Sequence, residues 1–212
     1  MGCLTPDWQQ PKPDWEEARS MCRRVQLTPV TLAAPIFGDV LIRLRESHRK
    51  GGALLSAFQI SPDAGFDWFA SRNRLLEQDI LASLLWRSEI RQALPELMIP
   101  ISSEQDAAFQ SCVAGDGNGF KMESPFLFDG HLAQSLHTGG AYWKQQGDGK
   151  AERQLALSFC EAAFNSRFAE VLSYVSYDMW TRWFHGIAWD WTSVLFDLRL
   201  RNLWILAVTD TD

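Results

Sequence analysis

The pattern of hydrophobic and polar positions predicts helices along much of the chain. Asp14 can cap a helix over residues 15–24, and Glu17, three positions later, can close a capping box. In longer stretches apolar residues recur every three or four positions, which is typical of helices that bury one face. These stretches are residues 38–50, 66–94, 151–164 and 165–186. The second of them follows the helix-starting pair Ser61-Pro62 and gives the longest predicted helix.

Near the end of the chain the period changes to two. Residues 188–197 alternate between two faces, residues 203–208 form a short apolar run, and residues 198–202 can turn between them. These segments predict a β-hairpin, which must join a small sheet or lie on the helices because two strands are marginal alone in water. We therefore expect an α+β fold: a mainly helical single domain over residues 1–212 with a C-terminal antiparallel β-hairpin in a small sheet.

Prolines and glycines indicate the irregular parts of this domain. Three prolines predict an extended arm over residues 1–14, and glycines concentrated in residues 114–150 predict a loop region. Shorter elements are expected around and within the loop region. They are a strand at 97–101, a helix at 103–113, a strand at 120–128 and a helix at 131–136.

Charge and composition narrow the classes of function. The 20 Lys and Arg residues against 26 Asp and Glu give a net charge of −6, which disfavours a nucleic-acid binder and favours a protein partner with a basic surface. The acids are enriched over residues 170–212. No apolar run is long enough to span a membrane and no basic, apolar leader is recognisable, so a cytoplasmic protein is expected. The four scattered cysteines predict reduced thiols and no metal site, and no cofactor motif is found.

One catalytic arrangement can be written for the C-terminal third. His185 could act as general base, with Asp190 or Asp210 as its orienting carboxylate, in a small hydrolase or transferase. The same residues also have a structural interpretation. His185 can bind the free carbonyls at a helix end, and Asp190 can accept an indole N–H.

Tryptophan gives a second alternative. Five of the 10 tryptophans fall between Trp180 and Trp204, and although most should be core, exposed ones would suit an aromatic ligand-binding module or a protein interface. The candidate binding residues are Trp189, Trp191, Asp190, Asp197, Asp210 and Asp212.

The segment from residue 180 to 212 carries a family resemblance. A Trp-Phe pair at 183–184, Ala-Trp-Asp at 188–190 and a closing Thr-Asp-Thr-Asp at 209–212 resemble bacterial immunity proteins of polymorphic and type VI secretion toxin systems. The resemblance does not extend to residues 1–150 and assigns no contact residue. It implies an immunity-type inhibitor that binds and neutralises a cognate bacterial toxin, such as a nuclease with a basic cleft, without catalysis.

Overall fold

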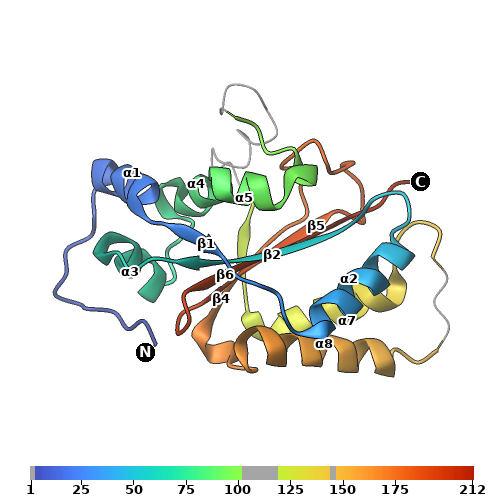
Figure 1. Ribbon diagram of the computed structural model, residues 1–212. Helices are drawn as coiled ribbons and strands as arrows, with labels where there is room; N and C mark the ends of the chain where they lie inside the picture. Colours follow the sequence, from blue (N-terminus) through green and yellow to red (C-terminus); the bar gives the residue numbers. More distant parts are fainter. Residues whose placement is uncertain (1–2, 102–118, 144–146) are drawn as a thin grey trace.

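A computed structural model describes residues 3–101, 119–143 and 147–212. In this part of the chain, a six-stranded antiparallel sheet runs through the middle of the molecule in the order β1-β2-β6-β5-β4-β3 (Figure 1). The strands are β1 (Leu27–Pro29), β2 (Gly52–Ile60), β3 (Lys121–Glu123), β4 (Val171–Ser176), β5 (Trp191–Asp197) and β6 (Asn202–Thr209).

Helices cover both faces of the sheet (Figure 1). One face carries α1 (Trp15–Arg24), α3 (Ala64–Ser71), α4 (Ile80–Leu85) and α5 (Ser88–Ala93). The other carries α2 (Pro35–Ser47), α7 (Phe128–Thr138) and α8 (Lys150–Phe164). Short 3₁₀ turns lie at Glu77–Asp79, Pro95–Leu97, Pro125–Leu127 and Phe168–Glu170.

Alternation along the central strands divides the core in two. On β6, Leu203 and Ile205 pack under α1, α3 and α4, whereas Trp204 and Leu206 pack under α2, α7 and α8. The ring of Trp204 lies 5.1 Å from that of Phe37. Because both faces are covered, every residue of β6 is buried. The sheet is therefore the middle layer of a three-layer domain.

The expectation of a mainly helical domain with a small C-terminal sheet is wrong. β5 and β6 pair with each other as a hairpin, but they form the centre of the six-stranded sheet, with β2 and β4 on either side. Neither β2 nor β4 is predicted from the sequence. β4 is buried at every position and β2 at most, so neither shows the alternation that reveals a half-exposed strand.

Two of the predicted helices are also wrong. The stretch 66–94 is broken into α3, α4 and α5, and Asn73, Gln78 and Asp79 take positive φ values of 55°, 53° and 55°, which no helix interior allows. The stretch 165–186 holds β4 and an irregular loop in place of a helix.

Other local predictions are confirmed. α1 has the predicted bounds, and its Glu17 backbone N–H donates to the Asp14 carboxylate at 2.8 Å. α8 starts one residue earlier than predicted and ends at Phe164. α2 is shifted toward Pro35, and α7 is longer than the expected helix at 131–136.

The remaining short elements differ from expectation. Residues 98–101 form no strand, and the strand predicted over 120–128 is only the three-residue β3. The helix predicted over 103–113 lies outside the described residues, as does part of the loop region 114–150.

The N-terminal arm is held against α3 by contacts to its backbone. The indole N–H of Trp68 donates to the Gln10 carbonyl at 3.0 Å, and the Gln10 side chain donates to the Ala64 carbonyl at 3.0 Å. The arm also reaches the β5–β6 turn, where the Leu4 backbone N–H donates to the Leu198 carbonyl at 3.0 Å. The expected extended arm therefore packs on the domain along its described length.

Cys22 and Cys160 should be unreactive toward alkylating reagents in the folded protein. Burial raises the pKa of Cys22 to about 11 and that of Cys160 to about 12, and alkylation requires the thiolate. We expect iodoacetamide at neutral pH to leave both thiols unmodified until denaturant is added, as followed by peptide mass spectrometry. Equal labelling rates with and without denaturant would contradict the packing around them.

Candidate functional site

Asp190 is a structural residue in the described fold. Its side chain is 1% exposed. It accepts the backbone N–H groups of Gly186 and Ile187 and the hydroxyl of Thr209. The carboxylate thus fixes the loop before β5 to the end of β6.

Asp197 is also bound within the fold. It is fully buried and pairs with both terminal nitrogens of Arg167, at 2.6 and 3.1 Å. It further accepts the backbone N–H groups of Arg199 and Leu200, at 2.8 and 3.0 Å. These four bonds hold the β5–β6 turn, so Asp197 offers no free acceptor to a partner.

Asp210 joins two connections that are far apart in sequence. It is 2% exposed and accepts the backbone N–H of Lys50 at 2.9 Å and that of Ala141 at 3.0 Å. Gly140 lies so close that an added Cβ would fall 1.9 Å from the carboxylate. Of the four candidate acids, only Asp212 is exposed.

The catalytic arrangement predicted around His185 is not formed. His185 is exposed, and in the described ranges no hydrogen bond or ion pair joins it to Asp190 or Asp210. Both carboxylates have other partners. The described residues also contain no cluster of three or more His, Cys, Asp or Glu side chains that could hold a metal ion.

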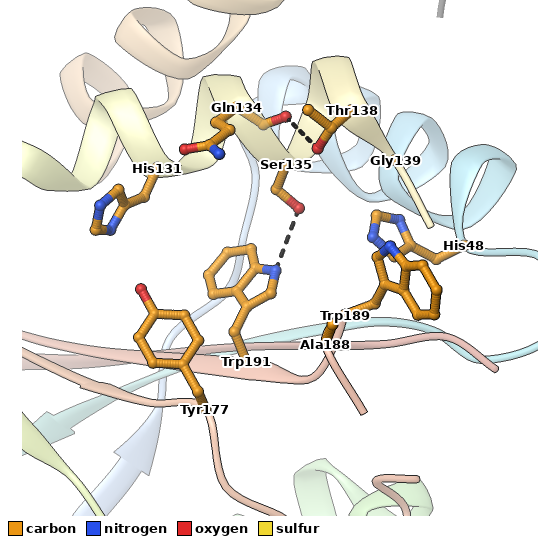
Figure 2. A pocket seen from close by; sticks show the side chains of 10 residues that line it. All are labelled: His48, His131, Gln134, Ser135, Thr138, Gly139, Tyr177, Ala188, Trp189 and Trp191. Carbon is orange, nitrogen blue, oxygen red and sulfur yellow. Dashed lines mark hydrogen bonds between the residues drawn. The ribbon is translucent and has the colours of Figure 1, made fainter. Parts of the chain in front are cut away.

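The two candidate tryptophans line a cleft, which we call the aromatic cleft (Figure 2). It has a volume of about 190 Å³. One wall is a face of α7, which presents His131, Gln134, Ser135 and Thr138 at helical spacing. The facing wall is aromatic and comes from the β4–β5 connection and the start of β5. Its rings are Tyr177, Trp189 and Trp191.

Hydrogen bonds fix the polar wall. The indole N–H of Trp191 donates to the Ser135 hydroxyl at 3.2 Å, which ties the two walls together (Figure 2). At one end, His131 Nδ1 lies 3.1 Å from a carboxylate oxygen of Glu123. Because a carboxylate only accepts, this nitrogen carries a hydrogen.

His48 lines the cleft beside Gly139 and is only 2% exposed. Its Nδ1 lies 2.9 Å from the Leu44 carbonyl oxygen and 3.0 Å from the Ser47 hydroxyl. A carbonyl only accepts, so Nδ1 carries the hydrogen and Nε2 of the neutral ring is left as an acceptor. Burial lowers the pKa of His48 below its ordinary value, against the opposing effects of the Leu44 hydrogen bond and the Asp210 charge.

This lowered pKa gives a stability that depends on pH. Below about pH 6.5 the unfolded chain takes up a proton at His48 that the folded chain resists, so the free energy of unfolding should fall as pH drops from there toward the folded-state pKa. We expect His48→Gln to lose this part of the pH slope, as measured by urea unfolding at several pH values. Parallel slopes for both proteins would show that His48 does not contribute.

The sequence predicts only part of one wall of the cleft. Trp189 and Trp191 are among the predicted binding residues, and the structure brings them together with Tyr177 and α7. His131, Gln134, Ser135 and Thr138 are missed, although their spacing of three, one and three places polar side chains on one face of a helix. None of the three buried acids is among the residues that line the cleft.

No protein-family model matches the chain, and no curated protein is significantly similar to it. Within the described residues, no helix has both the length and the apolar character needed to cross a membrane.

Proposed function

We propose that the chain is an immunity-type inhibitor, a cytoplasmic protein that binds and neutralises a cognate bacterial toxin without catalysis. The observation that carries the proposal is the aromatic cleft, because Trp and Tyr rings in a pocket are the side chains that dominate binding energy at protein interfaces. The resemblance of residues 180–212 to immunity proteins agrees with it. The partner's basic surface follows from the net charge of −6.

In this proposal the surface that contacts the toxin consists of the aromatic rings of the cleft and not of the acids predicted from the sequence. Asp190, Asp197 and Asp210 are buried and bound within the chain. Tyr177, in contrast, is 58% exposed, and Trp189 and Trp191 are partly exposed. A segment of the toxin that entered the cleft would cover all three rings at once.

The test is protection from the toxin encoded beside this chain's gene. We expect co-expression of the chain to restore growth and the two purified proteins to form a complex. Tyr177→Ala combined with Trp189→Ala should weaken the complex by about tenfold or more, which is the typical loss for central aromatic anchors. Affinity is read by calorimetry and folding by melting temperature.

The matched control is Trp15→Ala, which removes a ring that is 46% exposed on α1, on the opposite side of the sheet. It should leave the affinity unchanged. Absence of any complex or protection would refute the inhibitor, whereas a full effect of Trp15→Ala would place the contact elsewhere.

A second candidate function is an aromatic ligand-binding module. The polar wall on α7 and the aromatic wall facing it are the two surfaces that a small sugar or nucleoside requires. Quenching of tryptophan fluorescence by such a ligand, lost in the Trp189→Ala protein, would favour this function over the inhibitor. The hydrolase or transferase alternative gains no such support, because its proposed acid and base do not converge.

A further inference from the structure

Tyr177, the most exposed ring of the aromatic cleft, differs from the other exposed aromatic side chains, because each of those has a cation or another ring against it. Arg72 lies over Trp8, Arg19 over Trp15 and Lys50 over Tyr142, at 5.2, 5.6 and 4.5 Å from the ring centres. Phe126 stacks on Phe168 at 5.5 Å. Among the described residues, Tyr177 is the one large aromatic side chain that is exposed without a ring or cation against it.

The electrostatic surroundings of the cleft favour a positive occupant. No Lys, Arg, Asp or Glu is among its described lining residues. A carboxylate acts on each of its two imidazoles, since Glu123 contacts His131 and the charge of Asp210 raises the pKa of His48 against the effect of burial. An exposed aromatic face near carboxylates attracts cations and repels anions.

The polar groups of the cleft are suited to accept hydrogen bonds. The Nδ1–H groups of both imidazoles are directed to acceptors of the chain itself, which leaves the Nε2 atom of the neutral His48 ring with a lone pair. The Ser135 hydroxyl, the Gln134 amide oxygen and the Tyr177 hydroxyl can accept as well. A guanidinium group, which has five N–H donors and no acceptor, complements this set, and its plane stacks on aromatic rings.

We propose that the aromatic cleft binds the guanidinium group of an arginine side chain, stacked on Tyr177 and presented by the toxin. The source of the arginine rests on the proposed function, but the recognition of the guanidinium group does not. An arginine entering here would do between chains what Arg72 does within this one, where its guanidinium lies 4.4 Å from the Trp68 ring centre.

The test uses two peptides that differ in a single side-chain group. Acetyl-Gly-Arg-Gly-amide and its citrulline counterpart, in which a neutral urea replaces the guanidinium, are titrated into the full ¹⁵N-labelled chain. The indole N–H signals of Trp189 and Trp191, assigned with Trp→Phe variants, report binding. We expect both signals to shift with the arginine peptide, which should bind about tenfold more tightly than the citrulline peptide.

Variants separate the cleft from general attraction to an acidic protein. Tyr177→Leu removes an exposed ring and should fold, yet it should weaken arginine binding by about threefold or more. Trp15→Leu, on the other side of the sheet, should leave binding unchanged. Equal binding of the two peptides, or shifts that survive Tyr177→Leu in full, would overturn the inference.

The outcomes also separate this inference from the inhibitor proposal. Arginine-selective binding without any toxin complex would support the arginine site and refute the inhibitor proposal. A toxin complex that depends on the cleft, with no preference for arginine over citrulline, would support the inhibitor proposal and refute the arginine site.

Discussion

Replacing Asp197 with alanine should lower the free energy of unfolding by about 3–5 kcal/mol, because one partner of a buried ion pair is removed and the other is left behind. Asp197 is fully buried, and Arg167 is largely shielded, with 16% of its side chain exposed. The Arg199 and Leu200 backbone N–H groups of the β5–β6 turn would lose their acceptor as well. Urea unfolding followed by circular dichroism measures the change.

Asp212→Ala is the matched control for Asp197→Ala. Both acids belong to the predicted binding set, but Asp212 is exposed at the end of the chain, and its loss should change stability by no more than about 0.5 kcal/mol. Similar stabilities for the two variants would mean that the Arg167–Asp197 pair does not hold the turn. A large loss of stability in the Asp197→Ala protein alone would show that this acid stabilises the fold and is not part of a contact surface.

Local signals in the sequence predict the elements that need little help from the rest of the chain. α1 has its own cap at Asp14, and α8 has a continuous apolar stripe, so both can be placed within a residue. β4 cannot. Its residues are all buried because helices cover both faces, and Leu172 and Val175 continue a spacing of four and three that also fits a helix. The identity of β4 depends on pairing with β5, which periodicity does not report.

The candidate site is only partly predictable for the same reason. The cluster of tryptophans and acids near the end of the chain directs attention to residues 180–212, but composition cannot separate buried acids from exposed rings. The cleft exists because α7 lies against the start of β5, which joins Ser135 to Trp191 across 56 positions of sequence. That contact follows from the layer arrangement, which the sequence pattern misjudges.

Asp190→Asn should lower the free energy of unfolding by about 2 kcal/mol although it replaces only one oxygen of the side chain, because hydrogen bonds to a buried charged acceptor are exchanged for weaker bonds to a neutral amide. The carboxylate accepts Gly186 N–H and Ile187 N–H on one oxygen and Thr209 on the other. An amide has one acceptor oxygen. If that oxygen keeps the Gly186 and Ile187 N–H groups, the NH₂ group faces the Thr209 hydroxyl, which must then turn its hydrogen away in order to accept.

The same substitution should also disturb the cleft, since Ala188 and Trp189 directly precede Asp190 in the loop that it fixes. We expect the Trp189 and Trp191 indole signals to shift or broaden in the Asp190→Asn protein while the Trp15 signal is unchanged.

Asp178→Asn is the matched control. Asp178 is a half-buried acid of the same β4–β5 connection, and its side chain forms no hydrogen bond or ion pair within the described residues. The substitution should therefore alter neither stability nor these signals. A stable Asp190→Asn protein with unshifted cleft signals would show that Asp190 does not hold the fold, and it would again be a candidate for contact with a partner. A destabilised protein with a disordered cleft would show that Asp190 contributes to the binding site indirectly, because it holds the loop that carries Trp189.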